Sequence, residues 1–268
     1  MRTTGEDAVG LTAASAPLAI RHLSSDDRVA VARWDAFVDA CPEASFFHKA
    51  GWQRIVSEVF RHRTYFLYAE RAGLIEGVLP LAQVKSLLFG NSLTSLPFAV
   101  YGGVAAASAA AVEALEREAQ ALARQLGVAH LELRNVRRRH AEWPLQDLYV
   151  RFRKDLAPDV EANMQAIPRK QRAMVRKGIK NGLSSEIDSD CRRFFALYAD
   201  NVHRHGTPAF SRRYFEALQQ VFGADCEILA VVEGSGRPLS SVLCFYFRDD
   251  VLPYFAAVEI SSRVFAAN

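Results

Sequence analysis

The sequence predicts an α/β protein in which one architectural unit occurs twice. In each half of the chain, two amphipathic segments of helical period precede a run of three strand-like segments. Turn-forming residues separate these strands at 72–73, 234–238 and 249–250, as short antiparallel connections require. A strongly basic segment lies between the halves. We therefore expect an α+β arrangement of two tandem units, each with a mixed sheet flanked by helices.

The first unit is expected to begin with two helices. In the segment 26–40, apolar residues such as Trp34 and Phe37 fall on one side of a helix, and Ser24 or Ser25 is placed to cap it. The segment after it has the same character, and alternating apolar residues then indicate strands. The further elements expected here are a helix at 50–60, strands at 64–69, 74–84 and 92–97, an Ala-rich helix at 105–126 and a strand at 129–133.

The second unit repeats this order incompletely. We expect a strand at 147–153, the basic helix at 167–183, helices at 192–203 and 212–222, and strands at 226–233, 239–247 and 251–258. No counterpart of the long helix at 105–126 follows them. The open sheet edge at 251–258 would favour aggregation or dimerisation. We therefore expect a truncated or altered C-terminus, with a tail at 1–18 that is disordered, a first unit at 19–153 and a second at 154–268.

Charge is concentrated in one segment. The net charge is only +3, but residues 150–182 hold nine Lys or Arg and three acids, a local charge of +6 that leaves −3 for the rest. This distribution indicates a local anionic ligand and disfavours a protein that coats nucleic acid. The basic stretch 167–183 also lacks the interleaved aromatic residues that stack on bases.

The remaining composition excludes several classes. The four cysteines lack metal-site spacing, so we expect small buried side chains and no zinc site. The first twenty residues contain acids and no sustained apolar run, which disfavours a signal peptide. No stretch of about 18 apolar residues could span a membrane. We therefore expect a cytoplasmic protein, with contact at the inner membrane surface as one alternative.

The basic helix at 167–183 is the most informative element. Pro168 suits the start of a helix, and Gly182 suits its end. Met174 and Ile179 are expected to anchor it, whereas Arg172 and Arg176, one turn apart, could grip a diphosphate. The alternative is a solvated basic face. Its six cations, with no acid among them, are Arg169, Lys170, Arg172, Arg176, Lys177 and Lys180.

Other candidates are single residues with ordinary alternatives. Lys85 follows a strand and could add charge to the same cleft, and Tyr101 precedes Gly102-Gly103, where a backbone can approach a ligand or simply turn. His205 is a candidate general base or a solvated loop residue. His48 and Trp52 are expected in the core, and the run 137–140 as a solvated loop that could meet anionic lipid or RNA. No GxSxG nucleophile motif or P-loop is present.

Several phrases of the sequence resemble the FemAB family, whose members contain two tandem units of the acyl-CoA N-acyltransferase (GNAT) type. The general motifs are SFFHKAGW at 45–52, the basic stretch at 172–182 and HGTPAFSRRYF at 205–215. The phrases VLPLAQVKSLLFG, SLPFAVYGG, IPRKQRAMVRKGIKNGL and VLCFYFRDDVLPY resemble the branch associated with exosortase/PEP-CTERM and exopolysaccharide loci.

The resemblance implies transfer of an acyl or aminoacyl group to an amine. Members of the family use aminoacyl-tRNA and a diphosphate-linked cell-wall precursor, so the implied partners are an anionic glycan or lipid-linked precursor and tRNA as donor carrier. No permanently bound cofactor is implied, and acyl-CoA stays open as a donor. Arg172 matches the position that contacts the precursor's phosphates, and Tyr214 a position where an aromatic hydroxyl meets the acceptor. GNAT-type sites often act through backbone groups and positioning, without a dedicated nucleophile.

Two functions of different classes follow. The first is an acyl- or aminoacyltransferase acting on an envelope or exopolysaccharide precursor. The second is a non-catalytic module that binds an anionic glycan precursor or a membrane surface through the basic helix.

Overall fold

The computed structural model describes residues 16–86, 90–147 and 149–259, and it divides into two compact units, Met1–Ala141 and Glu142–Asn268. The disordered tail expected at 1–18 lies almost entirely outside the described residues. The boundary expected between 153 and 154 falls in a segment of the second unit, 149–157, that forms neither helix nor strand.

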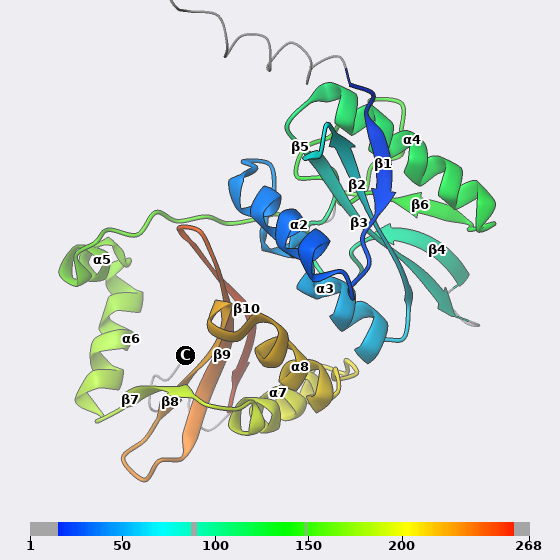
Figure 1. Cartoon of the computed structure of the whole chain (residues 1–268). Helices are drawn as coiled ribbons and strands as arrows, with labels where there is room; N and C mark the ends of the chain where they lie inside the picture. Colours follow the sequence, from blue (N-terminus) through cyan, green and yellow to red (C-terminus); the bar gives the residue numbers. More distant parts are fainter. Residues whose placement is uncertain (1–15, 87–89, 148, 260–268) are drawn as a thin grey trace, which may run out of the picture. The chain divides into compact units, whose positions relative to one another are not determined.

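The first unit is built on one sheet with the strand order β1-β2-β3-β4-β6, and β5 pairs with β3 beside this path (Figure 1). Neighbouring strands are antiparallel except β4 and β6, which are parallel because the helix α4 crosses over between them. The mixed sheet expected from the sequence is confirmed. Its strands are β1 (Ala19–His22), β2 (Arg63–Arg71), β3 (Leu74–Ser86), β4 (Gly90–Ser95), β5 (Ala105–Ala106) and β6 (His130–Glu132).

Strand β2 shows how the sheet is covered on both faces. Successive side chains of a strand point to opposite faces. Phe66 stacks on Trp34 of α2 (Arg28–Ala40) with ring centroids 5.5 Å apart, whereas the adjacent Leu67 belongs to the cluster that packs under α4. All three side chains are fully buried. Helices therefore cover both faces of β2, which explains its run of consecutive apolar residues.

Helix α4 (Ala109–Gln125) begins later than the sequence indicated. Ser108 caps it by accepting a hydrogen bond from the Ala111 amide at 3.2 Å, and Ala105–Ala106 pair with β3 as strand β5. The prediction of a helix from residue 105 is wrong, because pairing with β3 and the cap override the helical propensity of alanine. Its small residues allow close packing on β3, where a Cβ on Gly77 would lie 3.3 Å from the Cβ of Ala111.

A second helical segment follows α2 along the chain. The helix expected at 50–60 is present as α3 (Gly51–Arg54) continued by the π-helix η2 (Ile55–Val59). The 3₁₀ turn η1 (Phe46–His48) precedes it. His48 and Trp52 are 2% and 1% exposed, so their expected place in the core is confirmed.

The second unit contains an antiparallel sheet with the order β10-β9-β8-β7 (Figure 1). Buried and half-buried residues alternate along β8, as expected for a sheet with one well-covered face. Pro253 lies in β10, where an edge strand tolerates a residue without an amide donor. The strands are β7 (Ser184–Asp188), β8 (Cys226–Val232), β9 (Pro238–Phe247) and β10 (Asp250–Val258).

Helices α7 (Arg192–Arg204) and α8 (Arg212–Phe222) bury aromatic residues against this sheet. The Phe215 ring lies 5.0 Å from Phe194 of α7 and 5.3 Å from Phe255 of β10, measured between centroids. These contacts join both helices to the sheet and form the core of the second unit.

Two parts of the second unit differ from expectation. The strand predicted at 147–153 is wrong, since residue 147 and residues 149–153 form no strand, and residue 148 lies outside the described residues. Tyr149 and Phe152 are exposed there, so the alternating pattern has no partner strand to pair with. The structure adds β7 and a short helix, α5 (Val160–Ala166), which the sequence analysis did not predict.

Candidate functional site

Helix α6 (Arg169–Lys180) forms where the basic segment predicted it. Pro168 occupies the N-cap position, with its φ at −53°. At the other end, Gly182 has a φ of +74°, a conformation that favours glycine. The chain there turns back on the helix, and the Leu183 amide donates to the Gly178 carbonyl at 3.2 Å. Both predicted boundaries are therefore present.

The cations of α6 differ from most others in the chain. None of the six forms an ion pair with a residue that the structure describes, and the helix contains no acid. Elsewhere arginines are commonly paired, as Arg193 is with Asp188 and Glu186. Because uncompensated like charges repel one another, a helix of this kind is suited to an anionic ligand.

Arg172 and Arg176 lie one turn apart on α6 but in different surroundings. Arg172 is half-buried, and its Nε is enclosed without a hydrogen-bond acceptor among the described residues. Arg176 is exposed. The Arg172 guanidinium is thus the better fixed of the two, with a donor not satisfied by the described protein.

The apolar side chains of α6 do not anchor it. Met174 is 42% exposed and Ile179 is 63% exposed, and the only buried residue of the helix is Gly178. The prediction that Met174 and Ile179 anchor the helix is wrong, because no described element covers these two side chains. The apolar positions were visible in the sequence, but their exposure was not.

Tyr214 and His205 lie at opposite extremes of exposure. Tyr214 is fully buried on α8, with its ring 5.0 Å from Phe210 and 5.9 Å from Phe255 between centroids. Burial raises the pKa of the Tyr214 hydroxyl well above 10.0, so this group stays protonated. His205 is the exposed C-cap residue of α7.

Lys85 and Tyr101 belong to the first unit. Lys85 is an exposed residue of β3 that pairs with Asn91 of β4, and Tyr101 is half-buried in the loop after β4. Arg172, Arg176, Tyr214 and His205 belong to the second unit. The shared cleft expected for Lys85 and the basic helix therefore stays a prediction.

The loop 96–104 is held tightly by the protein itself. A Cβ on Gly103 would lie 2.0 Å from Asn135 Oδ1, and one on Gly102 would lie 2.7 Å from the Leu96 Cβ. Both glycines are therefore required by the packing of this loop. The interpretation that they admit a ligand is not needed to explain them.

Arg134 is the main support of this loop and was not singled out in the sequence. Its backbone amide donates to Ser95 Oγ at 2.7 Å, and its guanidinium donates to the Ala99 carbonyl at 2.5 Å. Leu96 and Phe98 have φ values of +48° and +67°, which are strained for residues other than glycine. The loop after β4 is thus a constrained segment, at the point where the parallel pair of β4 and β6 ends.

The run 137–140 is not simply solvated, as the sequence had suggested. His140 Nε2 lies 2.7 Å from Glu116 Oε2, and the Arg139 guanidinium donates to Glu43 at 2.9 Å. Arg138 donates to the carbonyls of His140 and Ala141. The segment is fastened to α4 and to the loop before η1, because the fold brings Glu116 to His140 and Glu43 to Arg139.

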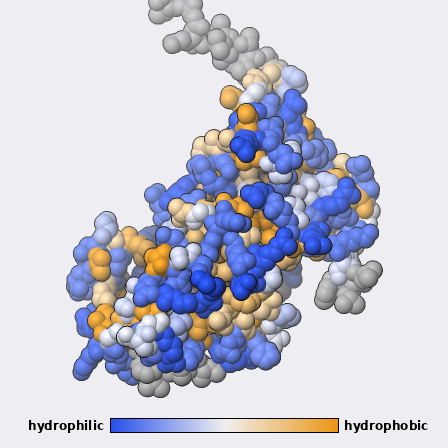
Figure 2. All heavy atoms as spheres, turned by 60° about the horizontal axis from the view of Figure 1, so that its bottom comes forward, coloured by the Kyte–Doolittle hydropathy of each residue, from blue (hydrophilic) through white to orange (hydrophobic). Residues whose placement is uncertain are grey.

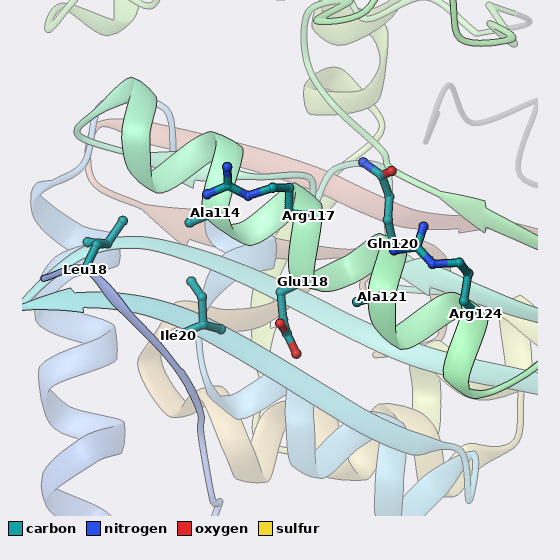
Figure 3. Close-up of a pocket in the computed structure, with 8 residues that line it drawn as sticks. All are labelled: Leu18, Ile20, Ala114, Arg117, Glu118, Gln120, Ala121 and Arg124. Atoms are coloured by element: carbon teal, nitrogen blue, oxygen red, sulfur yellow. The ribbon is translucent and has the colours of Figure 1, made fainter.

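A shallow hollow lies on the surface of the first unit between β1 and α4 (Figure 3). Its volume is about 480 Å³, and Leu18 and Ile20 face α4 across it. The side chains of Arg117, Gln120 and Arg124 extend from the helix around it. It contains none of the residues singled out as candidate site residues.

Three further findings concern the described residues. They contain no group of three or more His, Cys, Asp or Glu side chains that could hold a metal ion. Of the four cysteines, Cys41, Cys191 and Cys226 are buried as expected, and burial raises the pKa of Cys226 to about 12. Among the helices of residues 16–86, 90–147 and 149–259, none combines the length and the apolar character needed to cross a membrane.

Two α/β units in tandem, the first with a mixed sheet and the second with an antiparallel sheet, are each flanked by helices and define a protein of tandem GNAT-type fold. The fold is similar to that of the crystal structure of FemX, with a TM-score of 0.66 over 93% of this chain and 83% of that chain at 14% sequence identity. No family model matches the sequence, and no curated protein matches it.

Two weaker likenesses accompany this one. A tandem GNAT protein from the clavulanic acid biosynthesis pathway has a TM-score of 0.46 at 14% identity, over 92% of this chain and 81% of that chain. The C-terminal domain of a putative lysylphosphatidylglycerol synthetase from Agrobacterium fabrum has a TM-score of 0.47 at 10% identity, over 86% of this chain and 68% of that chain. Neither is close enough in structure to carry an argument about function.

Proposed function

We propose that the protein is an acyl- or aminoacyltransferase that modifies an amine of an anionic, diphosphate-linked precursor of the cell envelope or of an exopolysaccharide. The observation that carries this proposal is the combination of the tandem GNAT-type fold with a helix whose six cations have no ion-pair partner among the described residues. Resemblance of the basic segment to the FemAB family agrees with it.

The reaction needs a free amine, a stabilised carbonyl oxygen and alignment of the two substrates. The amine nitrogen attacks the acyl carbon, a new C–N bond forms, and the bond to the leaving group breaks. That group is a thiol if the donor is acyl-CoA and a ribose hydroxyl if the donor is aminoacyl-tRNA. The proton lost by the amine passes to a base or to the leaving group.

The described residues supply candidates for these tasks. Arg172 and Arg176 would hold the precursor's phosphates. The enclosed Nε of Arg172 has no acceptor among the described residues and would donate a hydrogen bond to a phosphate oxygen. His205 is exposed and is the proposed base. Tyr214 would have to contact the acceptor through its hydroxyl from a fully buried position, so its proposed role depends on local opening.

A second candidate function is a module that binds an anionic glycan precursor without transferring anything. The exposed cations of α6 favour it, because binding through that helix needs no other part of the chain.

The test is to offer acyl-CoA or aminoacyl-tRNA, together with an amine-bearing diphosphate-linked glycan, and to follow products by mass spectrometry. The transferase proposal expects a glycan whose mass has increased by the acyl group. Binding of the glycan in native mass spectrometry without any product for either donor would support the binding module instead.

A further inference from the structure

Apolar side chains that would normally be buried lie exposed along one continuous part of the second unit. Tyr149 is 92% exposed and Phe152 is 91% exposed in the segment before α5. The exposure continues through α5 and α6. The other exposed apolar residues of this part are Val150, Leu156, Val160, Met174, Val175 and Ile179.

Helix α6 separates its apolar and cationic residues onto different sides. With 3.6 residues per turn, the six cations occupy one arc of the helix and Met174 and Val175 lie on the other, while Ile179 lies at the border because it follows Arg172 by seven residues. A surface helix of a globular protein turns its apolar side to the core. In α6 this side is exposed, and only Gly178 is buried. The helix therefore adds little to the core of its own unit.

The segment before α5 has the same composition without being helical. Arg151, Arg153 and Lys154 alternate with the exposed Tyr149 and Phe152. Figure 2 shows hydrophobic patches among hydrophilic side chains on its left side, where Figure 1 draws α5 and α6. Apolar groups and cations thus occur together at 149–154 and again in α6, whereas the stretch between them contains Asp155, Asp159 and Glu161 and no cation.

We propose that residues 149–180 dock on an anionic lipid surface. Headgroup phosphates would neutralise the cations of α6, and the apolar arc would enter the boundary between headgroups and acyl chains. Tyr149 suits this boundary because its hydroxyl can stay hydrated while the ring is buried, and Phe152 adds a purely apolar ring that can leave water. The local charge of +6 over residues 150–182 complements such a surface.

An RNA partner fits these observations less well. Phosphates of RNA would also attract the cations, and Tyr149 and Phe152 could stack on bases, but the apolar arc of α6 is aliphatic and offers no aromatic face. These aliphatic side chains gain free energy by leaving water, which a bilayer allows. The docking proposal does not depend on the transferase activity.

The test is co-sedimentation of the full chain with vesicles of phosphatidylcholine alone or of equal parts phosphatidylcholine and phosphatidylglycerol. We expect binding only to the anionic vesicles. The variant Lys177→Gln/Lys180→Gln should bind roughly thirtyfold more weakly, since each cation near an anionic surface contributes about 1 kcal/mol. The variant Met174→Ser/Ile179→Ser keeps every charge and should bind at least tenfold more weakly, because it removes two buried apolar groups.

Two control variants make the same kinds of change, loss of a cation and loss of an apolar side chain, on the first unit. Arg117→Gln removes an exposed cation of α4, and Val29→Ser removes an exposed apolar residue of α2. Both should bind like the unaltered chain, and circular dichroism should show equal helicity in all variants. If Met174→Ser/Ile179→Ser bound the anionic vesicles as tightly as the unaltered chain, charge attraction alone would explain the binding, and the proposal would be overturned. Binding to a single-stranded RNA oligonucleotide without binding to anionic vesicles would overturn it as well.

Discussion

The imidazole of His48 joins two segments of the first unit that are far apart in sequence. Its Nε2 lies 2.9 Å from the backbone oxygen of Gly103, and its Nδ1 lies 3.0 Å from the backbone nitrogen of Ser45. Because the Ser45 amide can only donate, Nδ1 accepts, and the ring proton on Nε2 is donated to Gly103. This buried bridge fastens η1 to the constrained loop 96–104.

Replacing His48 by alanine should destabilise the first unit. The Gly103 carbonyl would lose a buried donor, and a cavity would open among the aromatic residues around η1. We expect a loss of about 1–3 kcal/mol in the free energy of unfolding, measured by urea denaturation. His22→Ala, at an exposed histidine of β1, should change it little. Equal stability of the two variants would show that the bridge contributes nothing.

Gly103→Ala should disturb the same loop from its other side. The added Cβ would lie 2.0 Å from Asn135 Oδ1 and 2.9 Å from its Cα, so the two segments must separate. Overpacking of this kind costs about 1–3 kcal/mol, which a thermal melt would detect. Gly234→Ala is the control, because a Cβ added there would meet nothing within 4 Å and the φ of Gly234 is not positive. A melting temperature unchanged in Gly103→Ala would contradict the packing role.

Glu76 links β3 to the start of α4 and should make stability depend on pH. Its Oε1 accepts from Arg71 Nε at 2.6 Å, and its Oε2 accepts from Ser108 Oγ at 2.8 Å. The hydrogen bond from Arg71 above all, and then that from Ser108, hold the pKa of Glu76 below its ordinary value of 4.5. The stabilisation from this carboxylate is therefore complete above the unfolded-state pKa and is lost as the pH falls through the lower folded-state pKa.

Glu76→Gln tests this dependence. At neutral pH the variant should be less stable by about 1 kcal/mol, and the difference should shrink as the pH falls below 4.5, the ordinary pKa. Urea denaturation over a series of pH values measures it. Glu58→Gln, which removes one partner of the exposed Arg54–Glu58 ion pair, is the control with little expected effect. A difference that stays constant at all pH values would exclude the carboxylate charge as its cause.

Arg172→Ala should weaken the proposed binding of a diphosphate-linked glycan. A charge-assisted hydrogen bond contributes about 1.5–3 kcal/mol, so we expect a tenfold to hundredfold rise in Kd by calorimetric titration. Arg172→Lys should recover only part of the lost affinity for the glycan, because an ammonium lacks the planar two-pronged geometry of a guanidinium. Arg117→Ala removes an exposed cation of α4 and serves as the control. Equal losses at Arg117 and Arg172 would indicate diffuse charge attraction.

The local pattern of the sequence determined much of the fold. Helical periodicity located α2, α7 and α8, and Pro168 and Gly182 marked the ends of α6. These features depend on neighbours in the chain, so a sequence contains them. The segment 147–153 shows the limit, because an alternating pattern becomes a strand only where another strand is available to pair with it.

The tertiary structure alone decided the surroundings of the candidate residues. The sequence showed six cations and three apolar positions in α6, but only packing decided that Met174 and Ile179 are exposed while Tyr214 is buried. Arg134, His48 and Asn135 acquire their roles around the loop 96–104 from contacts between residues distant in the chain. Burial and hydrogen bonding across such distances depend on how the elements pack, and no local pattern records that packing.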